Sequence, residues 1–191
     1  MIRPCHEDRT FSAGELRPED LAGAEFDRCV LRNGQWAGAN LSKARFTECT
    51  FEHCDLSNVV VDGTGFRTTV FKECKLLGVR FDHCHDFLLH LRFEQCRLDL
   101  ASFRALRMKG TRFAGCSLVE ADLSGTVLAN AEFNECDLAG AVFDGTDLTG
   151  ADLSTARHFD IDPTSNRIKG ARFALHGLPG LLTRYGIKVE P

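Results

Sequence analysis

Residues 121–155 read ADLSGTVLANAEFNECDLAGAVFDGTDLTGADLST, and every fifth residue from Leu123 onwards in this stretch is leucine or phenylalanine. The same count of five, carried towards the N-terminus, meets only apolar residues back to Phe93 and, after a two-residue slip, from Phe81 back to Phe11. All 28 positions sampled in this way are apolar in a chain that is 43% apolar. The sequence is therefore a repeat, and its period has to be explained first.

A period of five fits neither regular secondary structure. Five residues advance an α-helix by about 500°, so the sampled side chains would drift around the helix and share no face. Five is also odd, so in a flat strand successive centres would alternate between the two surfaces. The remaining solution is a chain that turns a corner every five residues and points each central side chain inward.

The cysteines give the number of sides. Cys54 and Cys74 are 20 residues apart, as are Cys96, Cys116 and Cys136 in turn, and the gap between the two sets is 22. Four segments per turn would stack these thiols in one column, with coils about 4.8 Å apart. Small residues two positions before most centres suit a narrow interior. The sequence therefore predicts an all-β, quadrilateral parallel β-helix of about seven coils.

Several segments resemble a known family. They are ANLSK (39–43), ADLSG (121–125), AEFNE (131–135) and ADLST (151–155). These segments are similar to the A-[DN]-[LF]-x-x signature of pentapeptide-repeat proteins. The resemblance covers roughly residues 11–158, and it implies that the four-sided β-helix is right-handed.

The repeat divides the single expected domain into three parts. We expect an N-terminal cap over residues 1–10, the β-helix over 11–158 with a two-residue bulge between 82 and 92, and a capping and dimerisation tail over 159–191. The N-terminal residues lack the apolar core of a signal peptide, and no apolar run approaches the ~20 residues that span a bilayer. These features, with a formal net charge of −4, predict a cytoplasmic protein without membrane contact.

Eight of the nine cysteines fall on the inward small-residue phase, and only Cys5 precedes the repeat. We expect them to be small buried hydrophobic groups in a reducing compartment rather than disulfides. His83, Cys84, His85, Asp86 and His90 are close in sequence, but alternate positions of an extended chain point to opposite sides. We therefore expect no zinc site and no cofactor.

Charge is distributed unevenly along the rod. Residues 113–165 contain ten acids and one base, Arg157, whereas residues 67–112 contain ten bases and five acids. Regular carboxylates on a stiff rod resemble the phosphates of a duplex, which predicts a partner that normally binds DNA. The alternative is that the repeat prefers Asp and Asn at these positions and that solvent covers them. The acids expected to face a partner are Glu120, Asp122, Glu132, Glu135, Asp137, Asp144, Asp147 and Asp152.

The two-residue slip between Phe81 and Phe93 predicts a bulge. Such a bulge turns Phe87 or Leu89 towards solvent as a contact point. The alternative is a packed bulge that only bends the rod.

The apolar residues of the C-terminal tail do not follow the five-residue period. Pro179 suits the first turn of a helix and Gly186 suits its end. The apolar residues have the helical spacing i, i+3, i+4 and i+7 at Leu178, Leu181, Leu182 and Tyr185. We expect a short α-helix followed by an extended segment, covering the open end of the β-helix by self-association. The expected dimer contacts are Leu178, Leu181, Leu182, Tyr185, Ile187 and Val189.

The tail sequence LLTRYGIKV (181–189) is similar to that of Qnr-type and mycobacterial fluoroquinolone-resistance proteins. Those proteins are rod-shaped homodimers that bind DNA gyrase or topoisomerase IV by resembling duplex DNA, although this chain lacks the two long loops of the plasmid Qnr proteins. The resemblance implies the same partners for this chain.

We find no phosphate loop, nucleophile elbow or catalytic pair, so we expect no enzyme activity. A protein-binding scaffold with another partner remains the alternative function. Direct nucleic-acid binding through the basic stretch from Arg67 to Arg112 is disfavoured because aromatic side chains for base stacking are not interleaved with it.

Overall fold

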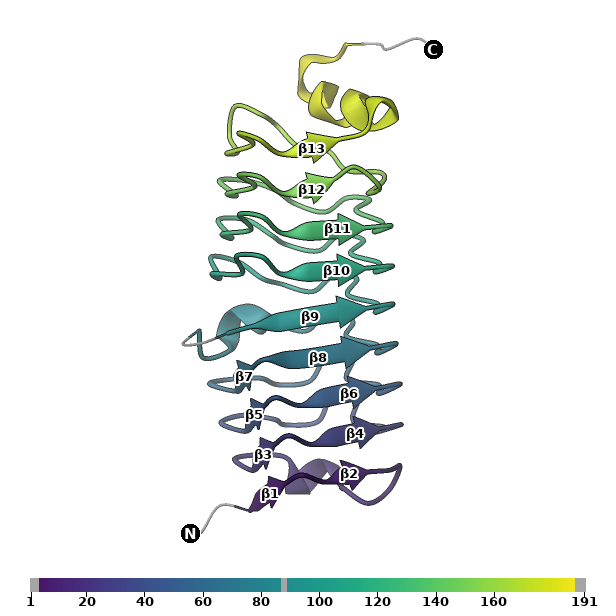
Figure 1. Ribbon diagram of the computed structural model, residues 1–191, viewed down its shortest axis with the longest axis vertical. Helices are drawn as coiled ribbons and strands as arrows, with labels where there is room; N and C mark the ends of the chain where they lie inside the picture. The colour runs from purple at the N-terminus through teal and green to yellow at the C-terminus, as the bar shows by residue number, and fades with distance from the viewer. Residues whose placement is uncertain (1–3, 87–88, 188–191) are drawn as a thin grey trace.

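The chain winds into a straight rod with its termini at opposite ends (Figure 1). The structure is a computed structural model that describes residues 4–86 and 89–187. Seen from the side, the chain crosses the front of the rod from left to right while it rises towards the C-terminus, so the coil is right-handed. All strand pairs are parallel, and the fold is the predicted all-β, four-sided β-helix.

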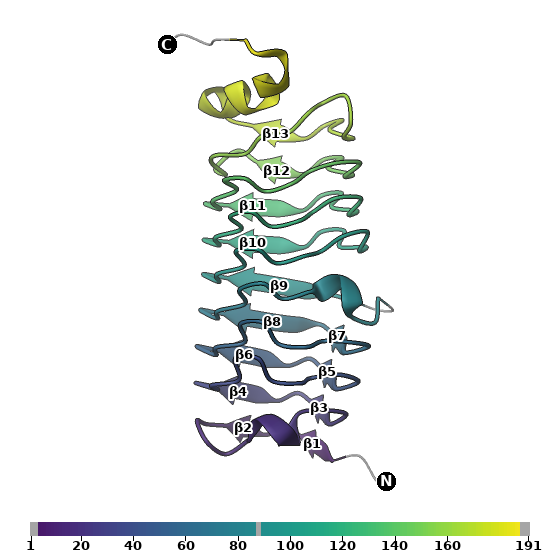
Figure 2. The ribbon, with the colours of Figure 1, turned by 180° about the vertical axis from the view of Figure 1, so that it is seen from behind.

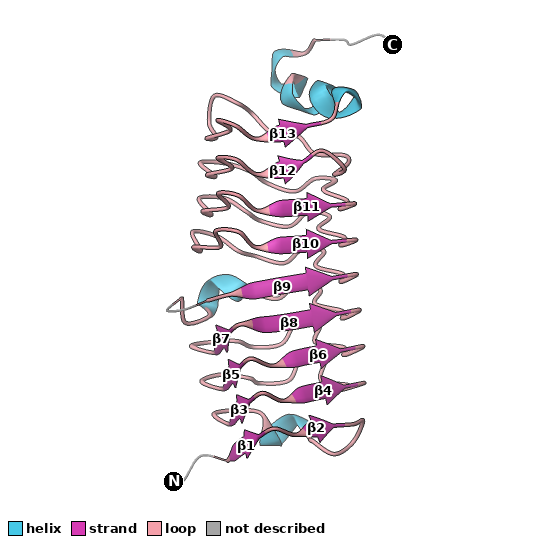
Figure 3. Cartoon of the chain, viewed as in Figure 1, coloured by secondary structure: helices cyan, strands magenta, loops and turns pink. Residues whose placement is uncertain are grey.

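Two sheets form two faces of the rod (Figure 3). The long sheet has one strand per coil and nine strands, so it spans about eight turns rather than the expected seven. Its strands are β2 (Thr10–Phe11), β4 (Val30–Arg32), β6 (Thr50–Glu52), β8 (Thr69–Lys72), β9 (Leu91–Glu94), β10 (Arg112–Ala114), β11 (Glu132–Asn134), β12 (Asp152–Leu153) and β13 (Arg172–Phe173). The shorter sheet contains β1 (Cys5–Glu7), β3 (Glu25–Asp27), β5 (Arg45–Thr47) and β7 (Gly65–Arg67).

The ladder extends beyond the repeat expected over residues 11–158. β1 pairs with β3 from Cys5 onwards, so part of the expected N-terminal cap already belongs to the first coil. At the other end, Phe173 pairs with Leu153. A short 3₁₀ helix, η1 (Pro18–Asp20), lies in the first coil.

The register confirms the two-residue insertion. Phe113 pairs with Phe133, twenty residues later, whereas Phe71 pairs with Phe93, twenty-two residues later. The 3₁₀ helix η2 (Phe81–His83) begins the insertion and stands out from the rod in the rear view (Figure 2). Leu89 is half-buried and packs against the core, so it is not a side chain that the insertion turns fully towards solvent. Phe87 lies outside the described residues.

Phenylalanine rings stack along the axis of the rod. Phe113 lies between Phe93 and Phe133, with ring centroids 5.2 and 5.0 Å away and interplanar angles of 7° in both cases. The eight cysteines of the repeat are buried and free, whereas Cys5 is exposed. Burial raises the pKa of Cys49 to about 12, so this thiol has no thiolate character at neutral pH.

Inward Cys and Thr side chains also satisfy the backbone. The thiol of Cys136 donates to the carbonyl of Phe113 at 3.4 Å, and the hydroxyl of Thr126 donates to that of Phe103 at 2.8 Å. These contacts explain why small donors recur at this phase of the repeat. An inward alanine packs equally well but has no side-chain donor, so the carbonyl has only the backbone ladder as its hydrogen-bond partner.

The C-terminal tail forms 3₁₀ helices rather than the expected α-helix. η3 (Leu175–Leu181) begins four residues before Pro179, and η4 (Thr183–Tyr185) ends at Gly186, whose φ of 61° confirms the predicted stop. Ile161 donates its backbone N–H to the carbonyl of Gly180 at 2.9 Å. The carbonyl of Gly180 therefore accepts a hydrogen bond from the last coil instead of from a later residue of an α-helix. This tertiary contact opposes a regular α-helix, and so does Pro179.

Candidate protein-binding surface

Five of the eight acids expected to face a partner are paired with arginines of neighbouring coils. Glu132 Oε1, for example, lies 3.2 Å from Nε of Arg112. The other four pairs are Asp122–Arg104, Asp137–Arg157, Asp147–Arg167 and Asp152–Arg172. Residues about twenty apart meet in the ladder, so bases that mostly lie outside residues 113–165 offset acids within it. The negative field expected for this end is therefore weakened.

Four of these paired acids also accept a hydrogen bond that stabilises the turn after them. Each aspartate lies just before an inward centre, and its Oδ1 accepts the backbone N–H two residues later. The four contacts are Asp122 to Ser124 at 3.0 Å, Asp137 to Ala139 at 3.1 Å, Asp147 to Thr149 at 3.0 Å and Asp152 to Ser154 at 3.0 Å. This is the Asx-turn, and it accounts for Asp at these positions without any partner.

Glu120, Glu135 and Asp144 differ from the other five acids. All three are exposed, and within the described chain none of them forms an ion pair. Glu120 and Glu135 occupy corners with φ of 56° and 55°, where side chains point away from the rod. These three carboxylates are the part of the predicted acidic surface that is free to contact a partner.

The hydrogen bonds to these aspartates make the stability of the protein depend on pH. Hydrogen bonds from Thr149 and Ser154 hold the pKa values of Asp147 and Asp152 below the usual 3.8. A depressed folded pKa stabilises the protein above the unfolded value, and this stability is lost as the pH falls through the folded pKa. We therefore expect the free energy of unfolding to fall below about pH 4.

The measurement is chemical denaturation at a series of pH values. The double variant Asp147→Asn, Asp152→Asn keeps the turn acceptor, as Asn40 does natively for the N–H of Ser42 at 2.8 Å, but it cannot titrate. Its unfolding free energy should therefore fall less steeply below about pH 4 than that of the wild type. Equal slopes for the two proteins would contradict the assignment.

The C-terminal end presents an apolar surface. Leu178, Tyr185 and Ile187 are 39%, 53% and 54% exposed. Leu181 instead packs against the core and Leu182 is half-buried, so only part of the expected dimer surface is accessible. Val189 lies outside the described residues.

Two residues at this end are not predicted by the sequence pattern. Leu175 is 85% exposed, the largest value among the exposed large hydrophobic side chains of the described chain. Arg184 pairs with Asp162 and ties η4 to the last coil. Arg184 also donates to the hydroxyl of Thr164, twenty residues earlier, and this spacing becomes a signal once the coil length is known.

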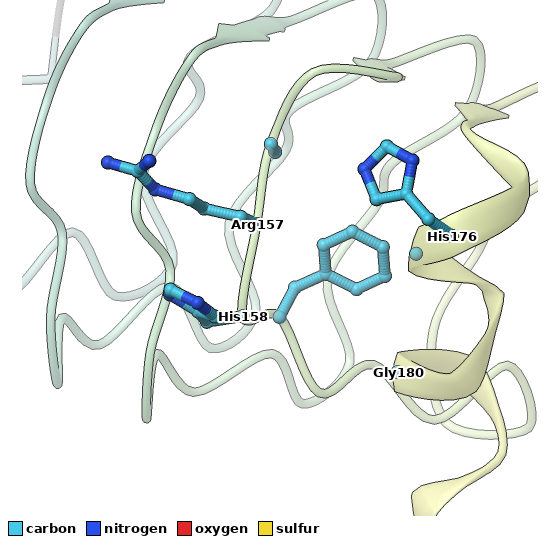
Figure 4. Close-up of a pocket in the computed structure, with 7 residues that line it drawn as sticks. Arg157, His158, His176 and Gly180 are labelled. Atoms are coloured by element: carbon cyan, nitrogen blue, oxygen red, sulfur yellow. The ribbon is translucent and has the colours of Figure 1, made fainter. Parts of the chain in front are cut away.

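A pocket of about 320 Å³ separates the last coil from η3 (Figure 4). His176 turns its ring into this pocket, whereas Arg157 and His158 point away from it. Both of these side chains contact Asp137, with His158 Nδ1 2.9 Å from Oδ1. The pocket is therefore a gap in the packing of the cap with one polar group directed into it.

No cluster in the described part of the chain is arranged as a metal centre, since no group of three or more His, Cys, Asp or Glu side chains is close enough. None of the helices in that part is long and apolar enough to cross a membrane.

A parallel β-helix with four five-residue faces per coil defines a class of repeat protein. Two family models match the chain: the pentapeptide repeat region over residues 44–123, and the pentapeptide repeats model of eight copies, which matches once over residues 24–63 and again over residues 116–154. Together they cover most of the coils described above. The chain belongs to the pentapeptide-repeat family.

The structure is similar to that of QnrB1, a plasmid-mediated fluoroquinolone resistance protein. A trypsin-treated form of QnrB1 superposes with a TM-score of 0.63 at 15% identity, covering 98% of both chains. Full-length QnrB1 gives a TM-score of 0.58 at 17% identity, covering 96% of this chain and 100% of its own. At identities this low, the structural similarity establishes the shared fold alone. No curated protein is significantly similar in sequence.

Proposed function

We propose that this protein is a non-enzymatic rod that binds a type II topoisomerase, DNA gyrase or topoisomerase IV, by resembling duplex DNA. The observation that carries the proposal is the likeness in fold to QnrB1, a fluoroquinolone resistance protein, over 98% of both chains. A rod that occupies the DNA-binding surface of the enzyme would compete with DNA, and so modulate the action of quinolones or toxins that act on the cleaved complex.

The exposed acids supply the chemistry of the contact. Glu120, Glu135 and Asp144 carry charges that no arginine of the described chain offsets. Fixed carboxylates on a stiff scaffold attract the basic surface of a DNA-binding protein at long range. The paired aspartates contribute less, because their charge is already balanced at short distance.

We further propose that two copies associate through the C-terminal cap. Leu175, Leu178 and Tyr185 are exposed together at the end of the rod. Joining two rods end to end buries this apolar surface and roughly doubles the length that a topoisomerase can contact. Sedimentation analysis should then show a dimer that Leu178→Lys with Tyr185→Lys dissociates.

The test is a gyrase supercoiling assay, with and without fluoroquinolone. Wild-type protein should alter supercoiling, and the triple variant Glu120→Lys, Glu135→Lys, Asp144→Lys should lose at least tenfold in potency. The matched control exchanges a paired acid and base, Arg112→Glu with Glu132→Arg, and should act like the wild type. An unaltered reaction with wild-type protein would count against the proposal, as would full potency of the triple variant.

The second candidate is a protein-binding scaffold with a different partner. The neutralisation of Asp122, Glu132, Asp137, Asp147 and Asp152 favours it, because a DNA-like surface requires uncompensated charge. Affinity capture with the wild type and the triple variant separates the two candidates. A dominant partner that is not a topoisomerase and that binds both proteins equally would support the scaffold.

A further inference from the structure

A notch lies where the two-residue insertion meets the next coil. A hollow of about 200 Å³ is lined by His90, Leu91 and Arg92 at the start of β9 and by Gly110 and Arg112 before and in β10. None of its five lining residues is acidic, and three of them have polar or charged side chains. The proposed topoisomerase-binding surface does not include this notch.

Among the described residues, the notch lies beside an open corner at Gly110. In the corner column that contains Gly110, a Cβ placed on Gly150 would lie 2.5 Å from Oδ1 of Asn130, one coil before it. A Cβ placed on Gly110 meets nothing within 4 Å among the described residues. No described residue fills at Gly110 the space that Asn130 fills beside Gly150.

Two arginines face this space from adjacent coils. The ladder pairs Arg92 directly with Arg112, so their side chains leave the same face about 4.8 Å apart. Like charges placed opposite each other in a sheet destabilise it. An anion held between the two guanidinium groups would offset that repulsion.

The guanidinium groups are oriented by acids that lie outside the notch. Nε of Arg92 lies 2.8 Å from Oε1 of Glu94, and Nε of Arg112 lies 3.2 Å from Oε1 of Glu132. Each glutamate holds its arginine in one orientation at the edge of the notch. Two oriented guanidinium groups on adjacent coils, each with five N–H donors, suit a tetrahedral oxyanion.

More positive charge lies beside the notch. Arg107 and Lys109, on the coil of Gly110, are exposed, and in the described chain neither forms an ion pair. They raise the local potential for any anion that approaches this corner. We propose that the notch binds a phosphoryl group, as inorganic phosphate or as the phosphate of a nucleoside monophosphate, between the guanidinium groups of Arg92 and Arg112 with His90 at the rim.

The test is calorimetric titration and thermal unfolding of the full chain with inorganic phosphate, at an ionic strength held constant with potassium chloride. We expect saturable binding and a rise in Tm that chloride does not produce. A nucleoside 5′-monophosphate and the same nucleoside without its phosphate identify the source: equal affinity for monophosphate and phosphate indicates the free ion, and tighter monophosphate binding indicates a nucleotide. Binding of the nucleoside alone would overturn the proposal.

Arg92→Gln and Arg112→Gln should each weaken phosphate binding at least tenfold. Arg97→Gln is the matched control, because Arg97 lies in the coil of Arg92 but on the next face, where it pairs with Asp99. Gly110→Asn narrows the notch with the residue that the same column carries one coil later, Asn130, at φ 57°. Gly110→Asn should also weaken phosphate binding. If an arginine variant fails to fold, Gly110→Asn still tests the proposal, because we expect it to retain the fold. Unchanged binding in Gly110→Asn, or equal loss in Arg97→Gln, would overturn the proposal.

Discussion

Replacing Phe113 with alanine is expected to lower the free energy of unfolding by about 3–5 kcal/mol. The ring is 0% exposed and stacks between Phe93 and Phe133 at centroid distances of 5.2 and 5.0 Å. Truncation removes buried apolar surface and two ring contacts at once. The hydrogen-bonded ladders above and below hold the coil spacing, so neighbouring side chains cannot collapse into the cavity, which places the loss towards the upper end of the range.

Urea denaturation followed by circular dichroism measures this loss. The control is Val142→Ala, which truncates a side chain that is 47% exposed and should change stability by no more than about 0.5 kcal/mol. Each coil contacts only its neighbours, so a weakened coil in the middle of the rod can also separate the unfolding of the two halves. A loss below about 1 kcal/mol in Phe113→Ala would show that the phenylalanine column does not carry the stability assigned to it.

The fold was predictable because the geometry of a solenoid determines the spacing of its inward residues in the sequence. The five-residue period required a corner in each segment, and the 20-residue spacing of Cys96, Cys116 and Cys136 required four segments per turn. The slip between Phe81 and Phe93 placed the insertion where the register changes from twenty to twenty-two. These properties depend on inward side chains, whose environment is the same in every coil.

The surface was harder to predict, because its energetics depend on neighbours one coil away. Counting charges along the chain placed Glu132 and Asp152 in an uncompensated acidic segment, whereas Arg112 and Arg172 offset them across the coil boundary. The same spacing of twenty that gave the fold also predicts these pairs, once it is applied to outward positions. Glu120, Glu135 and Asp144 stay exposed because no base occupies the matching position in the next coil.

The tail could not be predicted from local pattern alone. Leucine spacing before Gly186 indicated an α-helix, but the contact between Ile161 and Gly180 belongs to the tertiary structure. That contact draws the tail onto the last coil. The tight 3₁₀ turns of η3 follow from the close approach that glycine permits.

Replacing Gly180 with alanine is expected to detach the cap from the end of the rod. The added Cβ would lie 2.2 Å from the carbonyl oxygen of Phe159 and within 3.0 Å of its ring. The oxygen belongs to the backbone of the last coil and cannot turn aside as a side chain can, so η3 must move instead. The hydrogen bond from Ile161 to Gly180 is then lost, and we expect a cost of about 2 kcal/mol or more.

Hydrogen exchange of the Ile161 amide measures the detachment, because this amide is protected only by the docked cap. Its protection should fall at least tenfold in Gly180→Ala, while amides of β10 stay protected. Gly177→Ala gives a graded comparison: its Cβ would lie 2.8 Å from Cζ of Phe159, at the end of a side chain that can turn aside, so its effect should be smaller. Equal protection in the two glycine variants would mean that the backbone contact does not hold the cap, and that the apolar contacts of Leu181 do.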